Sequence, residues 1–419
     1  MEQIGDISLK LKSKVALSIF GLFTIVYVIA TGWWQSDFFI YISASKDLFL
    51  GKDIYIQTYG DGYHYYYSVL FAILIFPLSF LPIVAAQYIW LFFNAILMWR
   101  IVMILGRYFK LSALPIKEQW IFFVLCCLFS AKLTLANIYC HQVTILILFL
   151  TLEGLECILL SKKIKGAFLI ALGINIKLLP VVLIPYLLYR KEFRAVLFII
   201  VAYVLMLVLP LLIIGINRNN FLLGQWWSLI NPANNEHVLD VSQRGFHSLT
   251  TLLSTLLVDV PLERYDLQVK RNIANLSIAQ LSYVINMVRF TFIALSFYFL
   301  RTRPFVSEIS KTQRYWEISY ILLLIPLIFP HQQTYSFVFT LPAMWYILYC
   351  FLKEYKKMPK LKVGLMITAL IISFFTINAT FLLGEFIPFY EHFKTLTYGI
   401  LLLIPMLAAC TPDMVTSET

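Results

Sequence analysis

Asp37 is the acidic residue that the sequence places best for removing a proton from a substrate. It follows Trp33 and Trp34, and tryptophans are typical of the boundary between membrane and water. A carboxylate there is poorly hydrated, so it can act as a general base toward a hydroxyl group held beside it. The structural alternative is that Ser36 or Asp37 caps a helix through residues 38–50.

Lys177 is a cation at the centre of an apolar segment, between Ile176 and Pro180. An ionisable side chain inside a membrane is costly, and it indicates a functional role with a partner. No nearby acidic residue pairs with this lysine, so a phosphate group is its natural partner. The structural alternative is a lysine whose ammonium group extends to the membrane surface.

Three further residues could bind a phosphate. His331 lies in a tight turn between two apolar segments, where a histidine can donate a hydrogen bond or shuttle a proton near neutral pH. Arg244 and His247 lie in a long polar loop, and an arginine there could bind a phosphate through two parallel hydrogen bonds. Each of them could equally be an ordinary turn or loop residue.

Motifs for several other chemistries are missing from the sequence. The tyrosine-rich stretch 59–67 could stack against a sugar, or it could form an aromatic belt at the membrane surface. There is no P-loop, no glycine-rich dinucleotide motif and no HExxH motif, which argues against nucleotide hydrolysis and zinc proteolysis. The six cysteines show no metal-ligand spacing, so we expect neither structural zinc nor a disulfide framework. We expect no metal and no cofactor.

The composition requires a membrane protein. The chain has 419 residues, of which 61% are hydrophobic and 13% charged, with a mean hydropathy of +0.82. A soluble domain carries about 25% charged residues. Several apolar segments approach or exceed the ~20 residues that cross a bilayer as a helix. They are 15–33, 84–105, 195–215, 276–300 and 361–383. The predicted fold class is therefore an all-α, polytopic integral membrane protein.

The positive charges predict how the chain is threaded. The net charge of +11 comes from short clusters between apolar segments, so it indicates topology rather than nucleic-acid binding. If all clusters are cytoplasmic, the chain makes about twelve crossings (11–13), with both termini in the cytoplasm and the chain in the plasma (inner) membrane. Besides the long apolar segments, the predicted crossings include 118–137, 142–160, 315–330, 334–352 and 394–411. Residues 1–419 then form one membrane-embedded domain with outer loops at 34–65 and 216–275. The clusters begin at Lys10, Arg100, Lys162, Arg190, Arg301 and Lys353.

Two segments do not fit a simple crossing. Segment 66–82 is predicted to insert partly, with both ends on the outer side, although it could span instead. Segment 166–189 has basic residues at both ends and is interrupted by Lys177 and Pro180, which predicts two short helices meeting near Lys177. The same topology places Ser36–Asp37, His141–Gln142, the 216–247 loop and the turn at 331–333 on the outer face. Four polar sets on one face indicate a shared site.

Read together, these motifs resemble the multi-spanning glycosyltransferases of the GT-C type, and most closely glycosyltransferase family 87. The resemblance covers about residues 35–345, where the motifs occur in the family's order. Two departures, the missing Pro-Pro pair after Tyr65 and a histidine in place of glycine at His141, concern the sugar and acceptor more than the fold. The matching motifs are Asp37-Phe38-Phe39-Ile40-Tyr41, Leu48-Phe49-Leu50-Gly51, Leu81-Pro82, His141-Gln142-Val143-Thr144, Ile176-Lys177-Leu178-Leu179-Pro180, Phe246-His247-Ser248-Leu249 and Pro330-His331.

The resemblance implies an inverting transfer of a hexose, most often mannose, from a polyprenyl-phosphate donor to a lipid-linked or glycan acceptor. In this family the aspartate after the first helix is the base, which here is Asp37. The predicted partners are therefore the lipid donor, a glycan or glycolipid acceptor and the bilayer. The donor phosphate would be bound by Lys177, Arg244, His247 and His331, and the substrates by Tyr41, Tyr65, His141, Gln142 and Gln332.

Three other functions remain open at this point. A broken helix such as 166–189 also lines substrate sites in transporters and lipid flippases, although no inverted repeat is visible in the sequence. A second GT-C activity, such as a ligase or polymerase using diphosphate-linked donors, would share the same hydropathy. A scaffold with a degenerate site would share it too.

Overall fold

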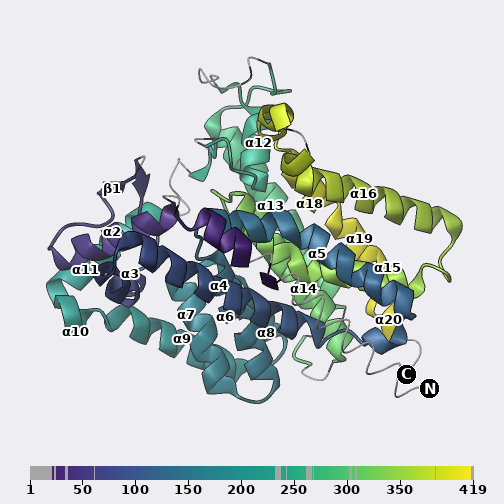
Figure 1. Ribbon diagram of the computed structural model, residues 1–419, viewed down its shortest axis with the longest axis horizontal. Coiled ribbons are helices and arrows are strands. Elements are labelled where there is room, and N and C mark those ends of the chain that lie inside the picture. Colours follow the sequence, from purple (N-terminus) through teal and green to yellow (C-terminus); the bar gives the residue numbers. More distant parts are fainter. Residues whose placement is uncertain are drawn as a thin grey trace.

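The computed structural model describes residues 21–416 except 23–24, 34–35, 61, 232–236, 242, 261–266, 268, 302–303, 307–308 and 383. The described part is almost entirely helical, with one short hairpin of β1 (Thr58–Tyr59) and β2 (Tyr63–His64) (Figure 1). The α-helices are α2 (Asp37–Phe49), α3 (Val69–Ile75), α4 (Ile83–Gly106), α5 (Ile116–Tyr139), α6 (Thr144–Leu159), α7 (Lys163–Ile176), α8 (Leu183–Tyr189), α9 (Phe193–Val208), α10 (Leu211–Ile214), α11 (Ile216–Ile230), α12 (Leu249–Leu257), α13 (Ile278–Leu300), α14 (Lys311–Ile328), α15 (Leu341–Glu354), α16 (Lys360–Leu382), α17 (Ile387–His392), α18 (Thr395–Leu401), α19 (Leu403–Ala409) and α20 (Pro412–Thr416). The 3-10 helices are η1 (Phe76–Phe80), η2 (Leu111–Ala113), η3 (Leu179–Val182), η5 (Thr334–Thr340) and η6 (Gly384–Phe386).

Six helical segments of the described chain are long and apolar enough to cross a membrane. They coincide with predicted crossings, and they are Ile83–Gly106, Ile116–Tyr139, Phe193–Ile214, Ile278–Leu300, Thr334–Glu354 and Lys360–Ala379. Shorter helices, α6, α14 and the α18–α19 pair, occupy three further predicted crossings. The predicted first crossing, 15–33, is helical over 25–31, whereas residues 15–20 and the basic cluster from Lys10 lie outside the described residues. The number of crossings therefore stays a prediction.

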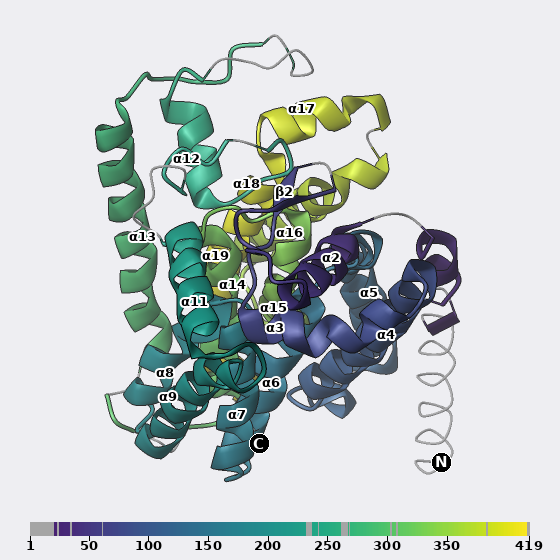
Figure 2. The same ribbon diagram turned by 90° about the vertical axis from the view of Figure 1, so that its left-hand side faces the viewer.

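The burial of these long helices shows which solvent surrounds them. Only 17% of the apolar window of α9–α10 and of α13 is buried, whereas 94% of the window within Thr334–Glu354 is buried. An exposed helix that is apolar around its whole circumference is stable only in an apolar solvent. In Figure 2, α13 stands at one edge of the molecule while α14 and α15 lie inside it. The chain is therefore an integral membrane protein with α14 and α15 at its centre.

The break predicted near Lys177 is present. Helix α7 ends at Ile176, Lys177 has an extended backbone conformation, and Pro180 lies in the first turn of η3. Helix α8 then returns toward the start of α7, because Lys163 Nζ contacts Glu192 Oε2 at 2.7 Å. The structure confirms that this segment is a pair of short helices whose ends away from Lys177 lie side by side.

Several of the predicted basic clusters also meet one another at the end of the molecule where α7 begins. Phe305 N donates to the carbonyl of Tyr189 at 2.8 Å, Tyr349 Oη donates to the carbonyl of Lys110 at 3.1 Å, and Lys356 Nζ lies 3.3 Å from Glu118 Oε1. This agrees with the expectation that these clusters share one side of the membrane.

Segment 66–82 folds as α3 followed by η1. Its helical part, Val69–Phe80, covers about 20 Å, which is less than the ~30 Å thickness of the hydrocarbon core. Ser68 caps α3, because its hydroxyl accepts a hydrogen bond from Phe71 N at 3.1 Å. A helix this short fits the prediction of partial insertion and cannot cross the bilayer by itself.

The prediction of an outer loop over 216–275 needs correction, because this region contains two helices, α11 and α12. Helix α11 begins with a run of polar residues, 217–220, which lowers its hydropathy, whereas its later residues give it an apolar face. It packs beside the segment that begins at Asp37: Arg218 Nη2 donates to the carbonyl of Leu48 at 2.6 Å, and Trp226 Nε1 donates to that of Tyr66 at 3.1 Å. Hydropathy alone misses helices that lie along a surface.

A buried ion pair joins α8 to α14. Arg190, 3% exposed, donates to both carboxylate oxygens of Glu317, which is fully buried. Tyr186 Oη also donates to Glu317 at 3.1 Å, and Arg190 Nη2 donates to the carbonyl of Leu300 at 3.2 Å. The sequence predicted Arg190 as one of the basic residues that keep a loop in the cytoplasm. The structure shows that it also joins the end of α8 to α14.

Arg190→Met should destabilise the fold by about 3–5 kcal/mol, because it leaves the Glu317 carboxylate buried without its cation. The measurement is thermal unfolding of the purified protein in detergent. Arg194→Met is the matched control, because Arg194 is an exposed arginine close by in sequence. Equal thermal unfolding midpoints for the two variants would show that the buried ion pair contributes nothing to stability.

Candidate active site

Asp37 is the first residue of α2, and its carboxylate is held by a side chain from another part of the chain. Gln142 Nε2 donates a hydrogen bond to Asp37 Oδ2. Tyr41, one turn further along α2, lies with its hydroxyl 3.4 Å from Gln142 Oε1 and 3.2 Å from Tyr67 Oη. Ser36 is the residue before the helix, but its side chain makes no capping bond. The capping alternative therefore does not account for this serine, and Asp37 engages Gln142 instead.

The turn between α5 and α6 places Gln142. His141 adopts a left-handed backbone conformation with φ 52°, which ends α5 and reverses the chain. Gln142 N donates to the carbonyl of Asn137 at 2.9 Å, and Trp90 Nε1 donates to the carbonyl of His141 at 2.8 Å. Gln142 is only 1% exposed. The turn therefore fixes the position of the Gln142 side-chain amide that donates to Asp37.

The electrostatic environment makes Asp37 suitable as a base. Burial raises the pKa of Asp37 to about 6, while the hydrogen bond from Gln142 and the positive charge of Lys177 act against this rise. A general base works best when its pKa lies near the operating pH. Asp37 is thus mostly ionised at neutral pH, yet it is a stronger base than an ordinary aspartate.

Lys177 comes to the same place from the break between α7 and η3. It is close enough to the Asp37 carboxylate for the two charges to influence each other. Asn175, just before it, is tied to the loop ahead of α3 because Ser68 Oγ donates to Asn175 Oδ1 at 2.8 Å. The structure therefore brings Asp37 and Tyr41 together around Gln142, with the cation of Lys177 close to the Asp37 carboxylate.

Two other predicted substrate-binding residues lie close by but are enclosed by protein. Tyr65 is fully buried, and its hydroxyl donates to the carbonyl of Ser68 at 3.0 Å, so it supports the loop that carries Tyr67. His141 is also fully buried, and burial lowers the pKa of His141 to about 4. Its ring is therefore neutral at pH 7, and neither residue offers a charge to a substrate.

His331 belongs to a second group. Its Nδ1 lies 2.6 Å from Asp240 Oδ1, and its Nε2 lies 2.5 Å from His237 Nδ1. His237 Nε2 lies 3.2 Å from the carbonyl of Leu229, where only an N–H can bond, so His237 Nδ1 must accept from His331. The imidazole of His331 therefore lies between the ring of His237 and the carboxylate of Asp240.

Asp240 anchors this second group. It is fully buried and accepts bonds from Ser248 Oγ at 2.9 Å, Thr251 Oγ1 at 2.6 Å and His331 N at 3.0 Å. Burial raises the pKa of Asp240, but the bonds from His331 and Thr251 outweigh it and hold the pKa below its ordinary value. The carboxylate is thus ionised. Because both nitrogens of His331 are occupied, that ring can donate to a phosphate only by displacing His237 or Asp240.

The remaining predicted residues pack around the same loop. His247 N donates to the carbonyl of Gln332 at 2.8 Å, and Gln332 Nε2 donates to that of Pro330 at 2.6 Å. Burial, with the charge of Lys394, lowers the pKa of His247 well below its ordinary value, so its ring is neutral. Arg244 is exposed, and its carbonyl accepts from Lys394 Nζ at 2.9 Å.

The contacts described above join the predicted residues within two neighbouring groups, and whether both line one cavity stays a prediction. The first surrounds Asp37 and Lys177, and the second surrounds Asp240 and His331. They lie at the same end of the helices, since Asn137 Nδ2 at the end of α5 donates to the carbonyl of Tyr335 at 2.8 Å, just after the turn that holds His331. Several residues that complete the two groups were not predicted from the sequence, namely Asn175, His237, Asp240 and Lys394, whereas Tyr67 lies in the tyrosine-rich stretch 59–67. His237 and Asp240 were recognisable as ionisable residues just before Arg244, whereas Lys394 gave no signal.

Comparison with known proteins identifies the family. The model of glycosyltransferase family 87 matches residues 65–305. The match includes Gln142, Lys177, Arg244 and His247, while Asp37 lies before it and His331 after it. No curated protein matches the chain.

Proposed function

Because the chain belongs to glycosyltransferase family 87 and is a membrane glycosyltransferase, we propose that it transfers a hexose, with mannose the expected sugar, from a polyprenyl-phosphate donor. The acceptor is a glycan or glycolipid at the outer face of the plasma membrane, and the transfer inverts the anomeric centre. The observation that carries this proposal is a carboxylate, Asp37, held by Gln142 beside the half-buried cation Lys177.

In the proposed reaction Asp37 takes the proton from the acceptor hydroxyl as its oxygen attacks the anomeric carbon. The new glycosidic bond forms on the face opposite the leaving group, and the bond between that carbon and the phosphate oxygen breaks. The electron pair leaves with the polyprenyl phosphate. Lys177 stabilises the negative charge that develops there, as a fixed cation in a poorly hydrated site does most effectively. Asp37 later loses its proton to water.

The second group has a revised role in this proposal. We propose that the ion pair of His331 with Asp240 holds the loop that carries Arg244 and His247 beside the site. Of these predicted phosphate-binding residues, only Arg244 combines a charge with an exposed side chain, so it is the one that would meet a donor arriving from outside. Lys177 remains the principal phosphate anchor.

The direct test is transfer by the purified protein in lipid vesicles. Radiolabelled polyprenyl-phosphate mannose and a polyprenyl-diphosphate sugar are supplied separately with a membrane glycolipid extract, and labelled product is measured after extraction. Product from the monophosphate donor alone is expected. Product from the diphosphate donor alone would instead indicate a ligase or polymerase, and movement of the donor across the vesicle without a new glycosidic bond would indicate a transporter.

The rate of transfer should depend on pH through Asp37. Since the pKa of Asp37 is about 6 and only the ionised form accepts a proton, kcat/KM should rise about tenfold per unit below pH 6 and level off above it. Gln142→Ala removes a hydrogen bond that lowers this pKa, so its profile should move to higher pH. A rate that is flat between about pH 4.5 and 8 would contradict Asp37 as the base.

A further inference from the structure

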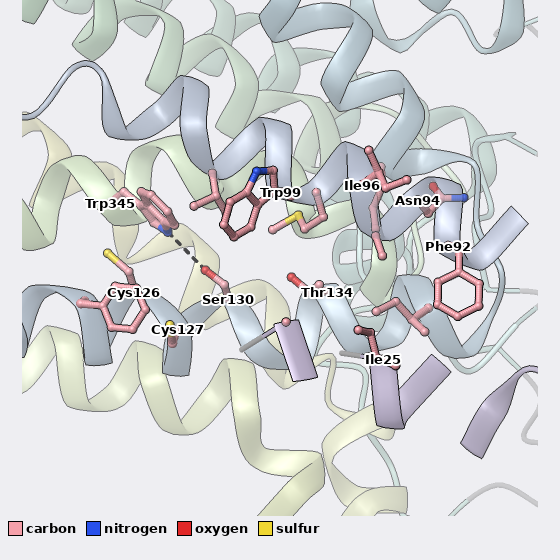
Figure 3. A pocket seen from close by; sticks show the side chains of 17 residues that line it. Ile25, Phe92, Asn94, Ile96, Trp99, Cys126, Cys127, Ser130, Thr134 and Trp345 are labelled. Carbon is pink, nitrogen blue, oxygen red and sulfur yellow. Dashed lines mark hydrogen bonds between the residues drawn. The ribbon is translucent and has the colours of Figure 1, made fainter. Parts of the chain in front are cut away.

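Tyr41 is one of the residues predicted to bind the substrates, but its side chain is fully buried. The centroid of its ring lies 5.0 Å from that of Tyr67, 5.5 Å from that of Phe71 and 6.2 Å from that of Trp90. Neither tyrosine lines the pocket of about 400 Å³ that opens between α4 and α5 (Figure 3), so a molecule in that pocket would not meet the two hydroxyls. The contacts of the Tyr41 hydroxyl are therefore with protein groups.

The hydrogen bonds that lead from Tyr67 to Asp37 all run in one direction. An ionised carboxylate can only accept, so Gln142 turns its amide N–H to Asp37 and its oxygen Oε1 to Tyr41. An amide oxygen can also only accept, so Tyr41 donates its single hydroxyl hydrogen to Gln142 Oε1 at 3.4 Å. The hydroxyl of Tyr67, 3.2 Å from that of Tyr41, must then be the donor in that pair. The donations therefore end at the carboxylate.

The opposite direction would leave a buried hydrogen without an acceptor. If the amide of Gln142 turned over, its N–H would donate to Tyr41, and Tyr41 would donate to Tyr67. Tyr67 is only 8% exposed, and its hydroxyl has no second hydrogen-bond partner among the residues that the structure describes. A buried donor without an acceptor is costly, and Oε1 would also face the carboxylate of Asp37. The two tyrosines thus favour the orientation of the amide that suits an ionised base.

The loop that carries Tyr67 is itself held in place on both sides. Tyr55 Oη donates to the carbonyl of Tyr67 at 3.0 Å. The next residue, Ser68, donates through its hydroxyl to Asn175 Oδ1 at 2.8 Å, two positions before Lys177. The loop therefore fixes the Tyr67 hydroxyl relative to the segment that carries the cation, as well as to the helix that carries the base.

We propose that Tyr41, supported by Tyr67, is a positioning residue that fixes the orientation in which Gln142 meets Asp37, and so keeps the base ionised between turnovers. This inference rests on the proposed function, because it takes Asp37 as the base. Only Asp37 touches the reacting atoms in this arrangement, and the tyrosines act through the amide. Their removal should therefore change the pH at which Asp37 loses its proton.

The kinetic test is Tyr41→Phe. It leaves the buried Oε1 of Gln142 without a donor, so the amide can turn over and accept from a protonated Asp37. The acidic limb of kcat/KM should therefore move up from about pH 6 by about one pH unit, while the rate above about pH 8 should approach that of the wild type. Tyr67→Phe should shift the limb less, in the same direction. Tyr63→Phe is the matched control, because Tyr63 is an exposed tyrosine of the same stretch, and it should leave the limb in place.

A double variant shows whether Tyr41 acts through Gln142. Gln142→Ala removes the amide, so the addition of Tyr41→Phe should not move the limb any further. A further shift would mean that Tyr41 acts on Asp37 directly, and an unshifted limb in Tyr41→Phe alone would mean that the tyrosine only packs. Either result would overturn the proposal. If Tyr41→Phe does not fold, Tyr67→Phe takes its place in the same comparison.

Chemical labelling tests the inference without sugar transfer. Dicyclohexylcarbodiimide reacts with protonated carboxyl groups in apolar surroundings, so labelling of the peptide that contains Asp37 should fall as the pH rises through the pKa of Asp37. The midpoint should lie about one pH unit higher in Tyr41→Phe than in the wild type. A shifted midpoint in a protein that transfers no sugar would support the positioning role and refute the proposed function. Sugar transfer with equal midpoints would refute the positioning role and leave the proposed function standing.

Discussion

Asp37→Asn should lower the rate of glycosyl transfer by about 10²-fold or more, because an amide cannot take the proton from the acceptor hydroxyl. Asparagine has nearly the same shape, and its oxygen can still accept the hydrogen bond from Gln142. The loss should therefore appear in kcat, with donor binding and thermal stability close to those of the wild type. The measurement is transfer by purified protein in lipid vesicles, across pH 5 to 8.

Asp47→Asn is the matched control for this substitution. Asp47 lies on the same helix, α2, but its carboxylate forms a surface ion pair with Lys52 at 2.8 Å. An exposed pair of this kind contributes little, so the control should keep most of its activity. If Asp37→Asn turned over at nearly the wild-type rate, Asp37 would not be the base, and the mechanism proposed above would fail with it.

Lys177→Met should lower kcat by about 10²-fold as well, since loss of one group that stabilises developing negative charge in a buried site has an effect of this size. A second effect distinguishes this role from a structural one. The charge of Lys177 lowers the pKa of Asp37, so its removal should move the acidic limb of the pH profile to higher pH. Lys177→Arg keeps the charge, so it should leave the limb near pH 6 and recover part of the rate.

Lys165→Met provides the comparison, because Lys165 is an exposed lysine near the start of the same helix, α7. It should behave as the wild type in both rate and pH profile. A Lys177→Met variant with reduced activity but an unshifted pH profile would place Lys177 away from Asp37. If Lys177→Met lost thermal stability in proportion to its loss of activity, the role of Lys177 would be structural rather than catalytic.

The two groups of predicted residues lead to different expectations for variants. Around Asp37 the expected losses are catalytic, because we propose that the carboxylate and Lys177 act on the reacting atoms. Around His331 the groups are bonded to one another, with Asp240 fully buried at the centre. Changes at His331 are therefore expected to act through the loop that carries Arg244.

The sequence by itself determined the features that depend on local composition. Hydropathy identified the long helices, and their exposed apolar surfaces agree with a membrane location. Proline and lysine within an apolar segment identified the break at Lys177, since Pro180 cannot continue a helix. Short motifs in the family's order indicated glycosyltransferase family 87, which the family match confirms. Hydropathy, a proline or a motif can each be read from neighbouring residues without knowledge of the rest of the chain.

Only the tertiary structure decided which of these residues meet. Gln142 reaches Asp37 across 105 positions of sequence because the turn after α5 lies beside the start of α2. The same packing ties His331 to Asp240, in a group beside the one that surrounds Asp37. The sequence also gave no sign of the pocket between α4 and α5. Such contacts depend on how several helices pack together, and the side chains involved look alike in sequence whether they face a partner, a substrate or lipid.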